Sequence, residues 1–325
     1  MAAEHVEECM ESVLGGSHSP TDESASAVTL GVFDGVHRGH RRLVEALKER
    51  ARLSCLRSVV VTFRNHPLSV LRPDFEPSYL STVERRIALL EETGVDEVAA
   101  VDFTSETATV TAADFVQLMC DRLGMRALVV GPDFALGRGR GGDIDFLRDT
   151  GRKVGFRLDV VEPLAQDGQR IDSTGIRQAL SAGDVTGAAR LLGRNYELAG
   201  EVVVGRGRGG PLGFPTANLR TAENLSVPAN GIYAAWAHID RAPRDSGLAK
   251  MMCATSIGTN PTFGESERTV EAFMLDFQGD LYGSSITLEF VRRLRDEERF
   301  ASVQALKEQV GRDVEITRAV LGGGQ

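Results

Sequence analysis

Short apolar runs alternate with segments of helical periodicity through the first half of the chain. Short β-prone runs predict strands, whereas apolar residues that recur every three or four positions predict helices. The predicted strands cover Ala27–Val32, Ser58–Phe63, Glu97–Asp102, Ala127–Gly131 and Arg157–Val161. The predicted helices cover Arg41–Leu53, Thr82–Thr93, Ala112–Leu123 and Ile144–Thr150. Because strands and helices alternate, the pattern predicts an α/β domain with a doubly wound parallel sheet.

The pattern changes near Tyr196, where strands follow one another without helices between them. These strands are predicted over Tyr196–Val204, Gly231–Ala237, Met251–Ile257, Thr269–Leu275 and Ile286–Phe290. Successive short strands of this kind are typical of a small antiparallel β-barrel. A terminal helix is predicted over Ser302–Leu321, with an apolar stripe formed by Val303, Leu306, Val310 and Val314.

Breaks in the periodicity set the expected domain limits. Residues 15–26 are rich in glycine, serine and acidic side chains, so residues 1–26 are expected to form a flexible tail. The α/β domain is expected over residues 27–183. Short helices broken at Gly183 and Gly193 predict a helical connector over residues 184–195, and the barrel domain follows over residues 196–325. A chain of 325 residues is long enough for two domains.

Composition narrows the classes of function. The formal net charge of −9 and the lack of a long basic run argue against a general nucleic-acid surface. Cys9, Cys55, Cys120 and Cys253 are scattered, which favours reduced thiols over a disulfide framework. No apolar run is long enough to span a membrane, and the acidic start is unlike a secretory signal. We therefore expect a cytoplasmic protein without nucleic-acid or membrane partners, and the sequence does not indicate its oligomeric state.

Two histidines three residues apart follow the first predicted strand. Gly35 and Gly39 permit a tight turn there, and His37 and His40 would share one face of the following helix. Backbone N–H groups and the helix dipole favour an anion at this place, and imidazole donors suit the charge that develops on a leaving pyrophosphate. The motif therefore predicts a site for nucleotide phosphates. The alternatives are turn residues without a ligand, or half of a zinc site that needs further ligands.

The segment Gly-Arg-Gly-Arg-Gly-Gly occurs twice, at residues 137–142 and 205–210. Both copies satisfy the G-x-G-x-x-G pattern of dinucleotide-binding folds, but neither follows its strand at once and opens a helix. The first copy does precede a helix, and Asp159 lies about twenty residues further on, so a Rossmann oxidoreductase stays an alternative. As glycine-rich loops both copies can approach phosphates closely, and the alternative is a pair of flexible surface loops.

Oxygen-bearing side chains gather in the barrel half. Thr216 and Asn218 are two apart in an extended segment, so they point the same way and can offer two hard oxygen ligands to Mg²⁺. A turn with an asparagine cap is the alternative. In a later strand the alternation puts Glu271 with Phe273 and Leu275, on an apolar face where partial desolvation suits a general base. A solvent-exposed glutamate is the alternative there.

Six segments of the chain together carry a resemblance to one known family. They are Gly31-Val-Phe-Asp-Gly-Val-His-Arg-Gly-His40, Phe63-Arg-Asn-His-Pro67, Val130-Gly-Pro-Asp-Phe134, Arg170-Ile-Asp-Ser-Thr-Gly-Ile-Arg177, Leu212-Gly-Phe-Pro-Thr-Ala-Asn218 and Ile257-Gly-Thr-Asn-Pro-Thr262. With these segments the chain resembles the bacterial bifunctional riboflavin kinase/FMN adenylyltransferases, also called FAD synthetases. The likeness extends over nearly the whole chain from about Ala27.

For the first domain the resemblance implies a nucleotidyltransferase-like FMN adenylyltransferase, which joins FMN and ATP into FAD and releases pyrophosphate. His37 and His40 would be the catalytic residues that stabilise the transition state. The implied ATP-binding residues are Phe33, Gly35, His37, His40, Asp133, Arg170, Ser173, Thr174 and Arg177. An N-cap at Asp172 or Ser173 would present the start of a helix to the phosphates.

For the second domain the resemblance implies a riboflavin kinase-like barrel, which phosphorylates riboflavin to FMN with ATP. Glu271 would be the base that deprotonates the ribityl 5′-hydroxyl, and Thr216 and Asn218 would hold Mg²⁺. The implied ATP-binding residues are Gly205, Gly207, Gly213, Pro215, Thr216 and Asn218. The implied partners are the small molecules riboflavin, FMN and ATP, with Mg²⁺ as cofactor.

The chain departs from the family pattern in the segment that would contact the flavin. That segment comprises Arg64, Asn65, His66 and Pro67. Family members usually carry an acidic residue and a proline where Arg64 and Asn65 stand, so Arg64 reverses the charge. Asp172 replaces a usual serine, and Asp133 stands where some members carry asparagine. The alternatives are a riboflavin kinase with a degenerate or re-specialised adenylyltransferase domain, and a non-enzymatic flavin-binding regulator. The intact base Glu271 argues against the regulator.

Overall fold

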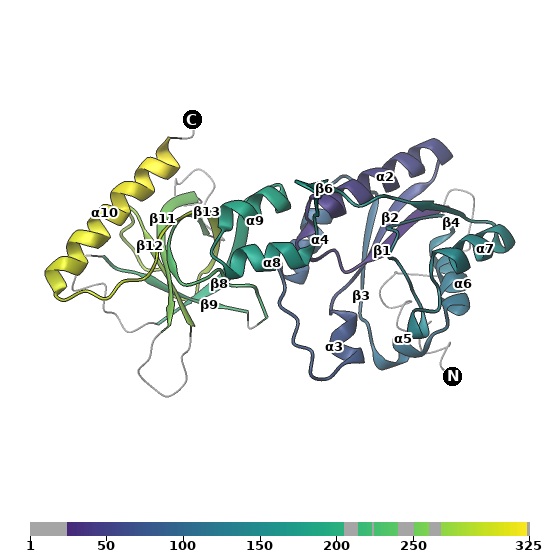
Figure 1. Ribbon diagram of the computed structural model, residues 1–325, viewed down its shortest axis with the longest axis horizontal. Helices are drawn as coiled ribbons and strands as arrows, with labels where there is room; N and C mark the ends of the chain where they lie inside the picture. Colours follow the sequence, from purple (N-terminus) through teal and green to yellow (C-terminus); the bar gives the residue numbers. More distant parts are fainter. Residues whose placement is uncertain (1–24, 205–213, 223, 240–249, 260–267, 324–325) are drawn as a thin grey trace. The chain divides into compact units, whose positions relative to one another are not determined.

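The structure, a computed structural model, describes residues 25–204, 214–222, 224–239, 250–259 and 268–323. The chain divides into two compact units between Asp172 and Ser173 (Figure 1). The domain limits taken from the sequence stay a prediction. The expected tail lies outside the described residues up to residue 24.

The first unit is built around a sheet (Figure 1) that has five strands in the order β3-β2-β1-β4-β5. Its strands are β1 (Ser26–Gly31), β2 (Arg57–Phe63), β3 (Glu97–Val101), β4 (Met125–Val130) and β5 (Arg157–Val160). Its α-helices are α2 (Arg38–Ser54), α3 (Pro67–Leu71), α4 (Val83–Glu91), α5 (Ser105–Thr109), α6 (Ala112–Leu123) and α7 (Ile144–Val154). Every neighbouring pair of these strands is parallel, so the predicted doubly wound parallel sheet is confirmed.

Both faces of the sheet are buried at its central strands β1, β2 and β4, which explains why these strands are largely apolar. Val59 and Val61 of β2 belong to one core cluster, together with residues of α6 and with Leu147 of α7. Val60, which points to the opposite face, belongs to a second cluster with Leu47 of α2. Helix α2 therefore packs on this second face of the sheet, against β1 and β2.

The second unit contains a closed antiparallel barrel with the strand order β10-β11-β12-β9-β8-β13 (Figure 1). Its strands are β8 (Tyr196–Val203), β9 (Ala217–Thr221), β10 (Gly231–Ile239), β11 (Lys250–Thr259), β12 (Arg268–Met274) and β13 (Ser285–Arg295). Helices α8 (Ser173–Ser181) and α9 (Val185–Leu192) precede the barrel, and α10 (Val303–Gly322) follows it. The predicted barrel is confirmed, but the sequence showed β9 only as an extended segment, because it is five residues long.

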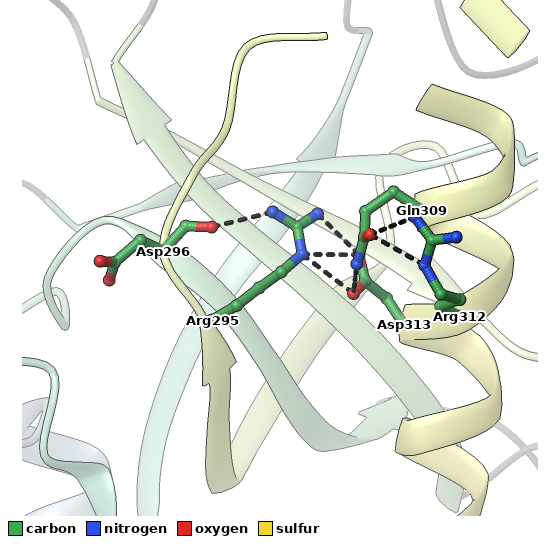
Figure 2. A network of polar contacts seen from close by, with 5 residues as sticks. All are labelled: Arg295, Asp296, Gln309, Arg312 and Asp313. Carbon is green, nitrogen blue, oxygen red and sulfur yellow. Dashed lines mark hydrogen bonds and ion pairs between the residues drawn. The ribbon is translucent and has the colours of Figure 1, made fainter. Parts of the chain in front are cut away.

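The terminal helix α10 corrects the predicted apolar stripe. Val303, the first member of that stripe, is 61% exposed, whereas Asp313, Thr317 and Leu321 are buried. The buried carboxylate of Asp313 accepts hydrogen bonds from the Arg295 guanidinium at the end of β13, at 3.0 Å from Nε and 2.7 Å from Nη2 (Figure 2). The packed face of α10 therefore includes a charged pair, which apolar periodicity alone does not reveal.

Candidate active sites

The predicted phosphate turn lies at the carboxyl end of β1, where the strand order of the first unit reverses between β1 and β4. Ligands of open α/β sheets bind at such switch points. Helix α2 begins at Arg38, three residues earlier than predicted, because His37 is its N-cap. The Nδ1 atom of His37 accepts a hydrogen bond from the backbone N–H of His40 at 3.3 Å.

The two imidazoles of this turn lie together. The rings of His37 and His40 are stacked, with centroids 3.6 Å apart and an angle of 19° between their planes. The ring of Phe33 meets His40 edge-on at 5.1 Å. Because Nδ1 of His37 is an acceptor, a neutral His37 carries its proton on Nε2.

The charge of His40 is suppressed by its surroundings. Burial, then the neighbouring His37, then the guanidinium of Arg86 hold the pKa of His40 well below its usual value. Its Nδ1 atom is buried and has no hydrogen-bond partner within the described residues. At neutral pH His40 is therefore an uncharged imidazole.

The backbone of the turn is strained and fixed from outside. Phe33 and Val36 have the positive φ angles 51° and 39°, which non-glycine residues rarely adopt. The carboxylate of Asp34 is 3% exposed and accepts the backbone N–H of Leu80 at 2.9 Å and 3.0 Å from its two oxygens. Such strain persists only where the surroundings impose it, and it is concentrated at functional sites.

Gly39 is required by close approach and not by its φ angle. A Cβ atom at this residue would lie 2.9 Å from the carbonyl oxygen of Ile171 and 3.1 Å from the ring of His37. Any side chain would therefore force the Ile171 carbonyl or the His37 ring to shift. Gly35, by contrast, has a φ of 72°, as the predicted tight turn requires.

The segment after β2, predicted to contact the flavin, is built mainly by its own hydrogen bonds. Asn65 exchanges two hydrogen bonds with the backbone of Phe103, from Nδ2 to the carbonyl and from the N–H to Oδ1, both at 2.8 Å. The backbone N–H of His66 donates to the Tyr79 hydroxyl at 2.7 Å, and Pro67 is the first residue of α3. Arg64 is exposed, whereas Asn65, His66 and Pro67 are half-buried.

Other residues assigned to the ATP site by the resemblance lie in both units. Asp133, which follows β4, forms an ion pair with Arg170 of the short strand β7 (Gln169–Arg170). Ser173, Thr174 and Arg177 lie on α8, in the second unit, and their role at this site stays a prediction.

The first glycine-rich copy, residues 137–142, is a turn whose two end glycines are packed and whose residues 138–141 are exposed. Leu136 pairs with Gly142, and a Cβ atom on Gly137 would lie 2.5 Å from the backbone nitrogen of Ala112 on α6. Asp143 then caps α7 through its side chain. The turn is separated from the end of β4, so it does not have the geometry of a dinucleotide fingerprint. The second copy, residues 205–210, and the later Gly213 lie outside the described residues.

The barrel brings the predicted kinase residues together. Asn218 of β9 and Glu271 of β12 are directly paired, and Thr216 Oγ1 donates to Glu271 Oε2 at 3.2 Å. Ser256 of β11 pairs with Glu271 from the other side. Because directly opposite residues point to the same face, three polar side chains form a row across three strands. Sequence reasoning missed Ser256, since the pairing of β11 with β12 is not visible in the sequence.

The alternation predicted for β12 is present for Glu271 and Phe273 but not for Leu275, which follows the strand and is buried like Met274. Val270, Ala272 and Met274 are buried on the core face, whereas Glu271 and Phe273 are half-buried on the other. Phe273 meets Phe214 edge-on with ring centroids 5.4 Å apart.

The zinc alternative for the histidine turn finds no further ligands in the part of the chain that the structure describes. Within the described ranges no group of three or more His, Cys, Asp or Glu side chains could hold a metal ion.

An open parallel sheet with a histidine turn at its switch point, followed by a closed barrel with a Thr–Asn–Glu group, defines a transferase of two modules. The family model described as FAD synthetase matches residues 19–175, and the one described as Riboflavin kinase matches residues 192–321. The chain belongs to the bifunctional riboflavin kinase/FMN adenylyltransferase family.

Relatives support this membership over the whole length. The bifunctional riboflavin kinase/FMN adenylyltransferase of Pseudomonas fluorescens is 38% identical over 311 residues, with 95% of this chain and 97% of the relative covered. The enzyme of the same description from Escherichia coli K12 is 35% identical over 313 residues, with 95% and 98% covered. That of Bacillus subtilis is 34% identical over 297 residues, with 90% and 91% covered.

A solved structure supports the fold. The crystal structure described as a macrolide-efflux protein from Streptococcus pneumoniae has a TM-score of 0.82 and 32% identity to this chain. The match covers 93% of this chain and 95% of that one. In this chain, none of the described helices is long and apolar enough to cross a membrane.

Proposed function

We propose that the first unit transfers the adenylyl group of ATP to FMN and that the phosphate turn carries this reaction. The supporting observation is the stacked pair of His37 and His40 at the N-terminus of α2. An oxygen of the FMN phosphate attacks the α-phosphorus of ATP, and the bond to the outer two phosphates breaks. We assign the Nε2–H of His37 and the first N–H groups of α2 to the charge of the leaving pyrophosphate.

The neutral state of His40 suits this role. An uncharged imidazole can donate a hydrogen bond to the departing phosphate without the full charge that would hold the product in the site. The remaining ATP contacts that we propose come from Phe33, Gly35, Asp133, Arg170, Ser173, Thr174 and Arg177. The exposed Arg64 supports a second candidate, in which the acceptor of this unit differs from FMN.

In the second unit we assign the phosphorylation of riboflavin to the row around Glu271. The carboxylate takes the proton of the ribityl 5′-hydroxyl, whose oxygen attacks the γ-phosphorus of ATP while the bond to ADP breaks. The hydrogen bond from Thr216 at 3.2 Å fixes the orientation of this carboxylate. Positioning and charge neutralisation supply most of the acceleration in phosphoryl transfer.

The oxygen set beside Glu271 fits Mg²⁺. Thr216 and Asn218 bring two neutral hard oxygens to the side of a carboxylate, and Mg²⁺ keeps few protein ligands when phosphates and waters complete its shell. When bound there, Mg²⁺ would neutralise charge on the ATP phosphates. Pro215 and the glycine residues Gly205, Gly207 and Gly213 are our candidates for the nucleotide-covering segment.

The proposed substrates indicate where the protein works and which partners it has. Riboflavin, FMN and ATP are small molecules of the cytoplasm, where we place this enzyme, and its acidic charge of −9 supports the absence of a nucleic-acid partner. The domain limits that we propose are residues 27–183 and 196–325, joined by residues 184–195.

The two activities should separate by mutation. Glu271→Gln is expected to slow the conversion of riboflavin to FMN by about 10²–10⁴-fold, because a positioned general base is lost. The same variant should still convert supplied FMN to FAD. His37→Ala should accumulate FMN, with FAD formation slowed by about 10²–10³-fold. The measurement is chromatography of flavins over time with purified full-length protein, Mg²⁺ and ATP.

Glu201→Gln is the matched control, since Glu201 is an exposed strand glutamate paired with Arg220. It should leave both activities at the native level. A Glu271→Gln variant with native kinase activity would exclude Glu271 as the base. A native protein that forms FMN but no FAD would favour a kinase with a degenerate or re-specialised adenylyltransferase unit.

A further inference from the structure

Arg86 of α4 is an arginine buried almost completely inside the first unit. Its side chain is 1% exposed, although arginine is seldom buried to this degree unless it is paired. Nη1 donates to the carbonyl oxygen of Phe63 at 2.5 Å, and the guanidinium lies 5.6 Å from the ring centroid of Tyr79. Its Nε atom has no hydrogen-bond partner within the described residues.

This burial is costly. Desolvation lowers the pKa of Arg86, and the negative charge of Asp34 is the largest influence that opposes it. An apolar side chain of similar length would avoid the desolvation penalty at this place. A buried charge with a perturbed pKa is a candidate for a functional role.

The contacts of Arg86 and its neighbours reach both segments of the candidate adenylyltransferase site. On the β2 side, Arg86 holds the carbonyl of Phe63, and the Tyr79 hydroxyl accepts the backbone N–H of His66 at 2.7 Å. Both ends of the segment from residue 63 to residue 66 are therefore bound by the stretch from Tyr79 to Arg86.

The same stretch also holds the phosphate turn. The backbone N–H of Leu80 donates to both carboxylate oxygens of Asp34, and the hydroxyl of Ser81 accepts the N–H of Gly35 at 3.2 Å. The charge of Arg86 is also felt at His40. Residues 79–86 therefore connect the end of β2 with the turn that follows β1.

We propose that Arg86 is a positioning residue of the adenylyltransferase. It fixes the end of β2 relative to the phosphate turn and keeps a positive charge near His40. The proposal rests on the function proposed above for these two segments. If one segment binds the flavin and the other the ATP phosphates, their separation sets the distance between the attacking oxygen and the α-phosphorus. A displacement of about 1 Å can cost about 10²-fold in rate.

The positive charge of Arg86 should also favour FAD formation. A cation in a site shielded from water interacts with a phosphate group more strongly than it would in solvent. Because the guanidinium is covered, it acts through the two segments and through its field, without touching the substrates.

The test compares Arg86→Met, Arg86→Lys and a control, Arg85→Met, in the full-length protein. Arg85 lies on the same helix but pairs with Glu92 at the surface, at 2.7 Å. Arg86→Met is expected to lower kcat for FAD formation from FMN and ATP by about 10- to 100-fold, with both KM values changed less than about threefold. Arg86→Lys, which keeps the charge but not the guanidinium fork, should recover part of this loss.

Riboflavin phosphorylation by the same preparations should stay native, and so should FAD formation by Arg85→Met. A native kcat in Arg86→Met, or a loss confined to KM, would overturn the proposal. If Arg86→Met does not fold, Arg86→Lys decides the question: reduced kcat with native KM supports the proposal, and a native kcat overturns it.

His37→Ala, measured in parallel, separates this proposal from the function on which it rests. FAD formation that survives His37→Ala would refute the assignment of the site, and with it the role of Arg86. Loss of FAD formation in His37→Ala, together with a native rate in Arg86→Met, would refute only the role of Arg86.

Discussion

The imidazole of His40 is half-buried with its Nδ1 atom fully covered, and its surroundings keep it neutral. Its stacking on His37 and the nearby charge of Arg86 both disfavour the imidazolium ion. Two imidazoles in contact therefore have different tasks: one caps the helix with its Nδ1 atom, and the other stays without charge. This arrangement makes the first unit sensitive to acid.

The pH dependence of stability follows from the lowered pKa of His40. In the unfolded chain this histidine takes up a proton below pH about 6.5, whereas in the folded unit it does so only at lower pH. The unfolded state then binds more protons, so the free energy of unfolding falls as the pH drops below about 6.5. Thermal unfolding between pH about 7.5 and 5.5 should show a steeper loss for the native protein than for His40→Asn. Equal slopes would contradict the burial of His40.

Helix α10 is attached to the barrel through a charged pair as well as through apolar contacts. The side chains of Arg295 and Asp313 are 17% and 5% exposed, and Gln309 adds a hydrogen bond to the same carboxylate at 3.0 Å (Figure 2). Asp313→Leu leaves the Arg295 guanidinium without its carboxylate partner, so we expect the barrel to lose about 1–3 kcal/mol of unfolding free energy. Urea unfolding measures this loss. Arg295→Met combined with Asp313→Leu should recover most of it.

Glu315→Leu, an exposed change on the same helix, should leave the unfolding free energy nearly unchanged. If the double variant is no more stable than Asp313→Leu alone, the loss does not come from the Arg295 charge that is left without its carboxylate.

Local sequence patterns predicted the helices and strands. Residues whose position depends on contacts between these elements could not be predicted. The alternation of apolar runs and helices was sufficient for the parallel sheet, and the histidine turn was recognisable because its residues are adjacent in sequence. Ser256 and Arg86 were not recognisable, because strand pairing and the burial of one helix face depend on tertiary structure. The buried Asp313 was missed for the same reason, since a polar residue is expected on an exposed face.

Each unit has its own buried core, so the two units should unfold separately. Leu128 is fully buried in the first unit, and Phe290 packs against Tyr196 and Tyr233 in the barrel. Trp236, the one tryptophan of the chain, lies on β10 with the Lys250 ammonium 4.8 Å from its ring centroid, so its fluorescence reports on the barrel.

Leu128→Ala should lower the melting temperature of a far-UV circular dichroism transition by roughly 5–15 °C, because a core cavity is created. The transition seen by Trp236 fluorescence should not move. Phe290→Ala should do the reverse. If either variant shifts both transitions together, the units unfold as one cooperative body.

The crowding around Gly39 has a consequence for how this sequence can change over time. Every substitution at residue 39 adds a Cβ atom 2.9 Å from the Ile171 carbonyl oxygen and 3.1 Å from the His37 ring, so each one is expected to strain the histidine turn. Arg64 is exposed, so substitutions there are expected to disturb the fold little. We therefore expect the adenylyltransferase unit to change more slowly at residue 39 than at an exposed position such as residue 64.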